Sequence, residues 1–256
     1  MKNKLLKPKL TKCCNVTIIG LGGVGSIVAR YGSIFLASLQ ENVVLTLVDG
    51  DKFEPSNASR MLFGRCGYKA SVVLQELLKR FRHSRLSLYA FCEYVMPRTE
   101  DKCGNIYALI KDRDIVILCV DNHATRKLVN DHCAKLKNIC LISGGNDGVG
   151  KDSSGTVRRG TFGNVQIYLR KHGKDLTPSL SAYHPEIANP KDKSPNELSC
   201  TELVVSKPQI LFSNLAVASA MLNTLLLHLS GQLPYSEIGF DISQGRAWPV
   251  VPIVRE

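Results

Sequence analysis

The chain has 256 residues, 44% of them hydrophobic and 21% charged, so it can bury the core of one large α/β domain and is not a disordered chain. The formal net charge of +11 predicts an acidic protein partner or a nucleotide, whereas the lysines are dispersed without interleaved aromatic residues, which disfavours nucleic acid. Nine scattered cysteines without any Cys-x-x-Cys pair predict free thiols in the cytoplasm and disfavour a four-cysteine zinc site.

Residues 1–14 form a basic, lysine-rich N-terminal segment without the apolar stretch of a secretory signal. From residue 15 to residue 145, apolar runs of strand length alternate with segments that have helical spacing. We expect strands over residues 15–20, 43–48, 86–95, 115–120 and 139–143, and helices over residues 24–39, 69–82 and 124–136. Strands separated by helices predict a Rossmann-like, mostly parallel sheet with helices on both faces.

After residue 145 the pattern changes to glycine, serine and aspartate, followed by strands of the antiparallel kind. We expect antiparallel strands over 157–170 and 237–254, a mobile loop over 172–200 and a helix over 208–230. That helix is apolar enough to suggest a membrane span, but lipid would make its polar groups costly, so we expect it to be buried. These polar residues are Ser213, Asn214, Ser219, Asn223, Thr224 and His228. Residues 15–256 are therefore predicted to form a single domain.

A glycine-rich turn joins the first expected strand to the first expected helix. Gly20, Gly22, Gly23 and Gly25 allow a tight turn whose backbone N–H groups approach phosphates at a helix N-terminus. The next strand ends at Asp49, where an acid commonly holds a ribose hydroxyl. The pattern predicts nucleotide binding. The alternative is a glycine turn used only for close packing of helix against strand.

The residues that follow favour ATP over a dinucleotide. Asp49-Gly-Asp51 is succeeded by Asn57, Arg60 and Lys69, and such cations neutralise a triphosphate better than they serve a nicotinamide. Asp121 ends the strand over 115–120, at the edge where open α/β sheets bind ligands, and a carboxylate near phosphates is a natural Mg²⁺ ligand. Taken singly, each has an ordinary explanation: Arg60 and Lys69 as surface charges, and Asp121 as a helix N-cap.

Five short motifs occur in the order found in one known family. They are Gly20-Leu-Gly-Gly-Val-Gly25, Val48-Asp-Gly-Asp51, Ser56-Asn-Ala-Ser-Arg60, Gly67-Tyr-Lys69, and Asp121-Asn122 with Arg126 and Asn130. With these motifs the sequence resembles the ThiF/MoeB/HesA family, the bacterial relatives of ubiquitin-activating enzymes. The motifs cover residues 15–145, and a looser likeness runs to residue 230.

The resemblance implies an adenylyltransferase that uses ATP and Mg²⁺. Residues 15–145 would be the nucleotide-binding half and 146–256 the partner-binding half. Asp49 would hold the ribose, Asn57 and Arg60 the phosphates, Lys69 the triphosphate and Asp121 the metal, with Asp51 and Asn122 completing the site. The carboxylate of a small ubiquitin-like protein would attack the α-phosphate, giving an acyl-adenylate and pyrophosphate. Alignment and charge stabilisation matter more than a base, because a carboxylate is already ionised at pH 7.

The sequence also departs from the family pattern. Ser59 stands where a Gln usually precedes the phosphate-binding Arg, the segment from Arg60 to Lys69 is short, and the zinc-binding cysteine pairs are absent. Many members supply an Arg from the N-terminal segment of a partner subunit, whereas residues 1–12 contain only lysines as cations, and Lys is the poorer bidentate clamp. The resemblance implies a homodimer.

The second half is similar to a narrower group. Tyr183-His-Pro-Glu186, Ser199-Cys-Thr-Glu202, Pro208-Gln209 and Asn214 resemble the ThiF-type proteins of PRTRC-like mobile operons. Those operons are associated with ubiquitin-like and conjugating-enzyme-like proteins. Both are therefore expected partners.

Cys200 lies at the end of the long loop and just before a helix, where a thiolate would be stabilised, so it is the candidate nucleophile. An ordinary thiol is the alternative. Two other functions stay open: an NAD-dependent oxidoreductase that uses the same glycine turn, and a non-catalytic scaffold that binds a ubiquitin-like tail.

Overall fold

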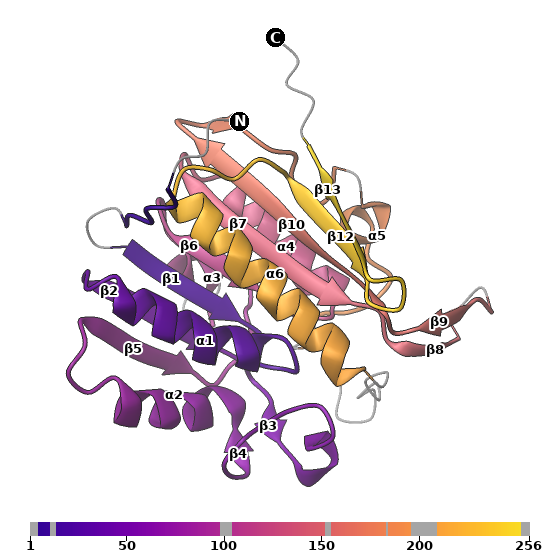
Figure 1. Cartoon of the computed structure of the whole chain (residues 1–256), viewed down its shortest axis with the longest axis horizontal. Coiled ribbons are helices and arrows are strands. Elements are labelled where there is room, and N and C mark those ends of the chain that lie inside the picture. The colour runs from indigo at the N-terminus through magenta and orange to yellow at the C-terminus, as the bar shows by residue number, and fades with distance from the viewer. Residues whose placement is uncertain are drawn as a thin grey trace.

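The computed structural model describes residues 5–10, 14–97, 104–151, 155–182, 184–195 and 209–251. Its centre is a nine-stranded sheet with the order β13-β12-β10-β7-β6-β1-β2-β5, in which β11 pairs with β10 (Figure 1). One half of this sheet is parallel and the other is antiparallel. Two small two-stranded sheets, β3-β4 and β8-β9, lie outside it.

The parallel half has the strand order of a dinucleotide-binding fold. Its strands are β1 (Cys14–Ile19), β2 (Val43–Val48), β5 (Leu86–Phe91), β6 (Ile115–Leu118) and β7 (Ile139–Asn146). The chain runs from β1 outward through β2 to β5, then returns to β6 on the other side of β1 and continues to β7. Between β1 and β6 the strand order therefore reverses, and ligands bind at such points in open α/β sheets.

The antiparallel half extends the sheet beyond β7. β10 (Phe162–Lys171) pairs with β7 from Gly163 to Arg170, and β12 (Glu237–Asp241), β13 (Arg246–Val250) and the short β11 (Lys174–Asp175) follow. The predicted α/β class, with a Rossmann-like parallel sheet extended by antiparallel strands, is confirmed.

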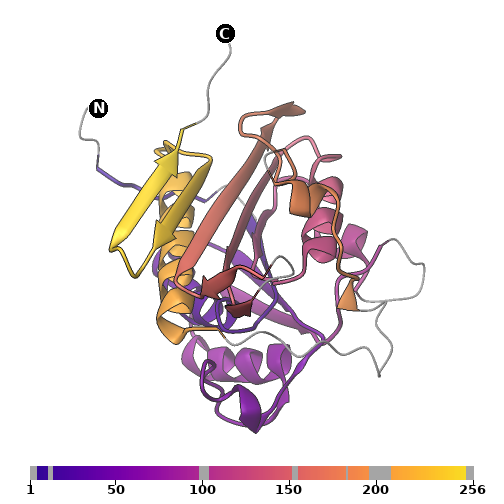
Figure 2. The ribbon, with the colours of Figure 1, turned by 90° about the vertical axis from the view of Figure 1, so that its right-hand side faces the viewer.

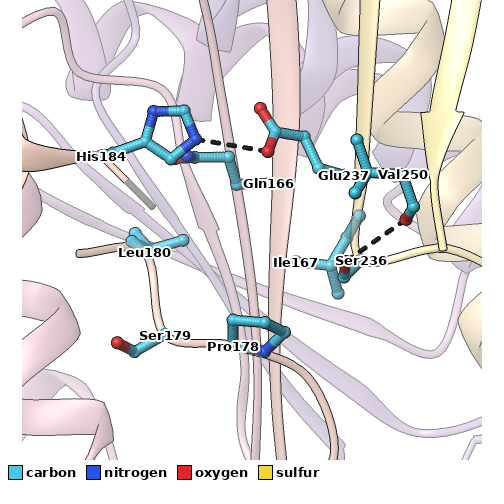
Figure 3. Close-up of a pocket in the computed structure, with 9 residues that line it drawn as sticks. All are labelled: Gln166, Ile167, Pro178, Ser179, Leu180, His184, Ser236, Glu237 and Val250. Carbon is cyan, nitrogen blue, oxygen red and sulfur yellow. Dashed lines mark hydrogen bonds and ion pairs between the residues drawn. The ribbon is translucent and has the colours of Figure 1, made fainter. Parts of the chain in front are cut away.

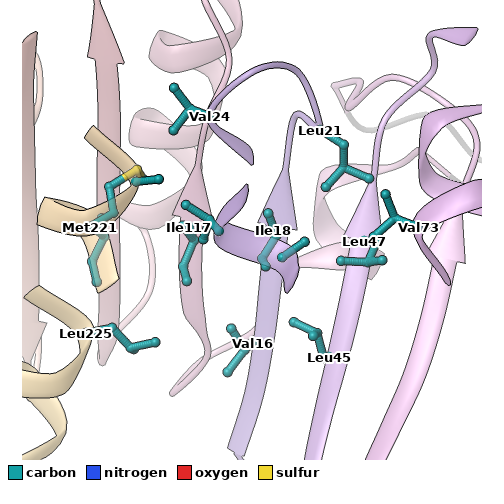
Figure 4. Packing of buried hydrophobic residues seen from close by; sticks show 14 of the residues in the cluster. Val16, Ile18, Leu21, Val24, Leu45, Leu47, Val73, Ile117, Met221 and Leu225 are labelled. Atoms are coloured by element: carbon teal, nitrogen blue, oxygen red, sulfur yellow. The ribbon is translucent and has the colours of Figure 1, made fainter. Parts of the chain in front are cut away.

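Helices cover both faces of the sheet (Figure 2). One face carries α1 (Gly25–Ser38), α2 (Lys69–Arg80) and α6 (Leu211–Leu229); the other carries α3 (Ile106–Leu109), α4 (His123–Cys133) and α5 (Pro185–Ala188). Alternate strand residues feed the two cores, since Ile18 and Leu47 pack on the α1 side (Figure 4) while Ile19 and Val48 pack on the α4 side.

Helix α6 is the one described helix long and apolar enough to cross a membrane by length and composition, with a mean hydropathy of 1.4. It packs against β7, β10 and α1, and buries Ser213, Asn214, Val217, Ala218, Met221, Thr224 and Leu225. One face of the helix is therefore buried as expected, whereas Ser219 and Asn223 of the polar set are exposed. It begins at Leu211, later than predicted, and Pro208 lies outside the described residues.

The described part of the predicted loop packs on α4. Leu180 and Ile187 are buried, and the carboxylate of Asp192 accepts hydrogen bonds from the first N–H groups of α4, those of His123 (2.7 Å) and Ala124 (3.0 Å). These contacts cap the helix N-terminus. The mobility predicted for 172–200 stays a prediction.

The shortest elements were not predicted. They are α3, α5, β3 (Lys52–Phe53), β4 (Gly67–Tyr68), β8 (Val149–Lys151), β11 and the 3-10 turn Pro55–Asn57, whereas β9 (Val157–Arg159) lies within the strand expected over 157–170. Pieces of two to four residues are too short to show a hydrophobic period, so composition alone does not reveal them.

Candidate functional site

The candidate site lies where β1 and β6 end side by side. Gly20 directly follows β1 and Asp121 follows β6 by three residues, and the N–H of Cys119 donates to the carbonyl of Ile19 across the two strands (2.8 Å). The sequence motifs of the first half therefore converge on the point of strand-order reversal.

The glycine loop needs its glycines for different reasons. Gly20 has a φ of +85°, which few residues with a Cβ adopt, and a Cβ on Gly25 would lie 1.8 Å from the carbonyl oxygen of Gly20. By contrast, a Cβ on Gly22 would meet only Met61, at 3.7 Å. The packing of the protein fixes Gly20 and Gly25, whereas the space beside Gly22 is open to a ligand.

Asp49, which ends β2, lies under this loop. Its carboxylate accepts hydrogen bonds from the N–H groups of Leu21 (2.5 Å) and Asp51 (2.7 Å), and the residue is 8% exposed. Burial raises the pKa of Asp49 to about 6, against the opposing attraction of Lys69. Asp49 thus joins the glycine loop at Leu21 to the turn at Asp51 through its two carboxylate oxygens.

Asp51 and Lys69 form an ion pair. Lys69 is the first residue of α2, and its Nζ lies 2.8 Å from a carboxylate oxygen of Asp51 with the Lys69 side chain 8% exposed. Burial opposes ionisation of Asp51, but Lys69 and the hydrogen bond donated by the Tyr94 hydroxyl lower its pKa. Tyr94 was missed by the sequence reasoning because a tyrosine after a strand carries no motif. Its ring packs on Gly50, where a Cβ would lie 2.8 Å away.

Asn57 and Arg60 follow β3 in and just after the 3-10 turn. The Asn57 side chain accepts a hydrogen bond from the N–H of Glu54 (3.3 Å), and Arg60 is half-buried, with its N–H donating to the carbonyl of Asn57 (3.1 Å). Because Met61 is the side chain nearest Gly22, this turn lies beside the glycine loop.

Asp121 is exposed beyond the end of β6, and Asn122 is the N-cap of α4. The Asn122 oxygen accepts from the N–H of Thr125 (2.7 Å), and its amide donates to the carbonyl of Lys193. The N-cap considered for Asp121 is therefore made by its neighbour, which leaves the Asp121 carboxylate at the sheet edge. No group of three or more His, Cys, Asp or Glu residues able to hold a metal occurs within the described ranges. A single carboxylate fits Mg²⁺ that arrives with nucleotide phosphates, because Mg²⁺ often takes only one or two protein carboxylates.

Arg126 and Asn130, which match the family motif, form hydrogen bonds within the protein. The buried guanidinium of Arg126 donates to the carbonyls of Val120 (2.7 Å) and Gly144 (3.0 Å) and to the Ser143 hydroxyl (2.8 Å), so it ties the end of β6 to β7. The Asn130 oxygen accepts from the N–H of Leu180 (2.9 Å) and anchors the segment that packs on α4.

Cys200 lies outside the described residues, as does Cys13. Among the described cysteines, Cys66 is exposed, whereas Cys140 is buried and Cys119 is partly buried beside Met221. Burial raises the pKa of the Cys119 thiol to about 12, which disfavours the nucleophilic thiolate. Cys140 thus belongs to the hydrophobic core, and Cys119 packs against it.

A small cavity of about 30 Å³ lies between β10, the segment before α5 and β12 (Figure 3). His184 lines it and joins two acids, with Nε2 3.2 Å from Glu237 and Nδ1 3.0 Å from Glu186. Hydrogen bonding to Glu237 raises the pKa of His184 despite partial burial. This histidine links the loop segment to the antiparallel half of the sheet.

Solved structures share this fold at low sequence identity. The chain is similar to Escherichia coli MccB in complex with ATP (TM-score 0.61, 17% identity, 93% of this chain and 65% of that chain). It is also similar to MccB in complex with N-formylated MccA (TM-score 0.63, 18%, 93% and 64%) and to PaaA (TM-score 0.62, 17%, 94% and 65%).

Curated relatives match about half of the chain. The adenylyltransferase and sulfurtransferase MOCS3 of Drosophila virilis is 36% identical over 133 residues, which cover 50% of this chain and 26% of that protein. MOCS3 of Caenorhabditis briggsae is 32% identical over 130 residues, 50% of this chain and 30% of that protein. The chain thus spans under a third of the length of these relatives. The model of the ThiF family matches residues 5–245. With its glycine loop, acids and cations at the reversal of a Rossmann-like sheet, this chain belongs to the ThiF family.

Proposed function

We propose that the chain adenylates a carboxylate with ATP. The observation that carries the proposal is that Asp49 bonds to the glycine loop at Leu21, Lys69 lies close to Asp49 and Asp51, and Met61, next to Arg60, is the side chain nearest Gly22. A nucleotide needs a ribose acceptor, backbone donors for its phosphates and cations for its triphosphate, and these groups supply all three. The MccB structure solved with ATP has the same fold.

Each residue then has a role in the transfer. Asp49 accepts from the ribose, Asn57 and Arg60 hold phosphate oxygens, and Lys69 turns its ammonium from Asp51 toward the triphosphate. Asp121 would hold Mg²⁺, which supplies charge neutralisation at the phosphates when bound. Asn122 lies at the same edge, although its cap bonds to Thr125 and Lys193 leave it a minor contact.

The reaction transfers AMP to the substrate. A carboxylate oxygen bonds to the α-phosphorus as the bond from that phosphorus to the bridging oxygen of pyrophosphate breaks, and the electron pair leaves with pyrophosphate. Lys69 and Arg60 offset the charge that develops on the leaving group. No proton has to move, so the site works without a general base.

The substrate is proposed to be the C-terminus of a small ubiquitin-like protein, as expected for a relative of the PRTRC type. The net charge of +11 suits an acidic partner, and the related MOCS3 is named an adenylyltransferase and sulfurtransferase. A conjugating-enzyme-like protein is the proposed acceptor downstream, and Cys200 the proposed sulfur nucleophile. The compartment proposed for these steps is the cytoplasm.

A homodimer is also proposed. α1 and α6 expose apolar side chains on their outer surfaces, among them Tyr31 (59% exposed) and Phe212 (69%), and such groups gain from a partner surface. Light scattering at micromolar concentration should give twice the chain mass, and a monomer would contradict the proposal.

The deciding experiment is ATP–pyrophosphate exchange with a candidate ubiquitin-like protein encoded beside the gene. We expect exchange with the free C-terminal carboxylate and none with the same protein amidated at its C-terminus. A thermal shift with NAD and none with ATP would favour an oxidoreductase. Binding of the partner and ATP without exchange would favour a scaffold, which Ser59 and the lack of an N-terminal Arg make worth testing.

A further inference from the structure

Asn214 packs directly on the glycine loop from the far end of the chain. It lies in the first turn of α6, is 0% exposed, and its Nδ2 is only 2.2 Å from the position that a Cβ on Gly23 would occupy. Neither the nitrogen nor the oxygen of its side-chain amide has a hydrogen-bond partner among the described residues.

A buried amide without partners is costly, because it has lost water and gained nothing in return. Its neighbour Ser213 shows the usual arrangement: it is equally buried and donates to the carbonyl of Gly160 (2.5 Å). Among the described residues, no hydrogen bond within the fold accounts for the buried Asn214 amide. A donor and an acceptor on one amide match the C=O and N–H of a peptide group, and Gly23 presents its backbone on the surface that Asn214 touches.

We propose that Asn214 is a positioning residue for the nucleotide and acts through Gly23. This inference rests on the proposed use of ATP. In the ligand-bound protein the Asn214 amide forms hydrogen bonds with the backbone at Gly23. These bonds hold the glycine loop so that the remaining N–H groups of the loop face the phosphates. The N-terminal end of α6 adds a favourable field for the same anion. Without ATP the amide has no hydrogen-bond partner among the described residues, and ATP binding supplies its hydrogen bonds.

This predicts opposite effects on stability and on binding. In Asn214→Leu, a side chain of similar size removes the unpaired amide, so the Tm of the ligand-free protein should stay level or rise. Its Kd for ATP with Mg²⁺, measured by calorimetry on the full chain, should rise about tenfold, the equivalent of about 1.4 kcal/mol. The KM for ATP in pyrophosphate exchange should rise by more than kcat falls. The control Ser213→Ala should lower Tm and leave the Kd for ATP unchanged.

A second pair of variants separates positioning from simple space filling. Gly23→Ala should weaken ATP binding and lower Tm, because its Cβ meets Asn214. Adding Asn214→Ala removes the clash, so the double variant should regain Tm but not ATP affinity. Wild-type affinity in Asn214→Leu, or full recovery of affinity in the double variant, would overturn the inference. A wild-type chain that binds no ATP would instead overturn the proposed function, and the inference with it.

Discussion

Lys69 and Asp51 lie 18 positions apart and meet in an ion pair of 2.8 Å whose lysine is nearly buried and whose carboxylate is half exposed. The N–H of Lys69 also donates to the Asp51 carbonyl (2.9 Å), so the start of α2 is fixed to the turn after β2 by backbone and side chain together. A cation held in place before its ligand arrives loses little entropy on binding.

Lys69→Ala should therefore reduce pyrophosphate exchange by roughly 100-fold, the usual scale for losing one preorganised charge contact in a transition state. The fold should survive, because the Asp51 carboxylate left behind is solvated and keeps its bond from Tyr94. The matched control is Lys127→Ala, which removes an exposed pair with Asp131 on α4 and should change neither exchange nor Tm measurably. Equal exchange rates in both variants would contradict the role of Lys69.

Asp49 predicts a pH dependence of ATP binding. Burial raises the pKa of its carboxyl group to about 6, so the protonated fraction of Asp49 grows as the pH falls below 6. Because the proposed ribose contact needs the ionised form, the Kd for ATP should rise as the pH falls from 7 to 5.

A fall in pH has the opposite effect on the stability contributed by Asp49. The folded state binds this proton more tightly than the unfolded chain, so the contribution of Asp49 to the free energy of unfolding grows as the pH falls through 6. Titration calorimetry at several pH values measures the binding. Asp49→Asn should bind weakly and show no such slope between pH 5 and 7, and a slope that persists in this variant would assign it to another group.

The parallel half could be predicted from sequence because each of its elements carries its own signal. The buried strand β6 is an unbroken apolar run, β2 is apolar except for Thr46, and the glycine turn marks the start of α1. The position of Asp121 at the site followed from the rule that parallel strands end at a common edge, and that of Lys69 from the order of the motifs. The partners of these residues did not follow, since Tyr94 belongs to no motif and the motif that contains Asn214 gave it no contact with the glycine loop; both reach the site through tertiary packing.

The sequence also did not show which motif residues bond mainly within the protein. Arg126 and Asn122 match the family pattern, and a pattern does not say whether a polar side chain faces ligand or protein. The structure gives Arg126 three protein acceptors across β6 and β7, and gives Asn122 the cap of α4. Only coordinates distinguish a residue that shapes the site from one that contacts the ligand.

His184 predicts a pH-dependent contribution to stability. Its pKa is raised by the hydrogen bonds to Glu237 and Glu186, so the charged form is favoured in the folded protein. The contribution is fully present below the unfolded pKa of about 6.5 and is lost as the pH rises through the folded value. The Tm difference between wild type and His184→Gln should thus be largest near pH 6 and shrink toward pH 9. Glu237→Gln should flatten the same profile, and a difference that grows with pH would refute the assignment.

Cys200 remains the proposed nucleophile after adenylation, and two chemical steps separate its role from that of the nucleotide site. The first step forms the acyl-adenylate and needs only the groups around the glycine loop. In the second, a thiolate attacks the acyl carbon, a carbon–sulfur bond forms, and AMP leaves with the electron pair of the bond that breaks. Cys200→Ala should therefore support full ATP–pyrophosphate exchange with the ubiquitin-like partner and yield no thiol-sensitive adduct.

The control is Cys66→Ala, because Cys66 is the exposed cysteine nearest in sequence to the phosphate-binding turn and Lys69. It should form the adduct as wild type does. Mass spectrometry of the unreduced reaction, with and without a reducing thiol, distinguishes the outcomes by the mass of enzyme plus partner less one water. An adduct that persists in Cys200→Ala and disappears in Cys66→Ala would move the nucleophile to Cys66. Unchanged conjugation without any adduct in wild type would mean that the adenylate passes directly to a thiol on another protein.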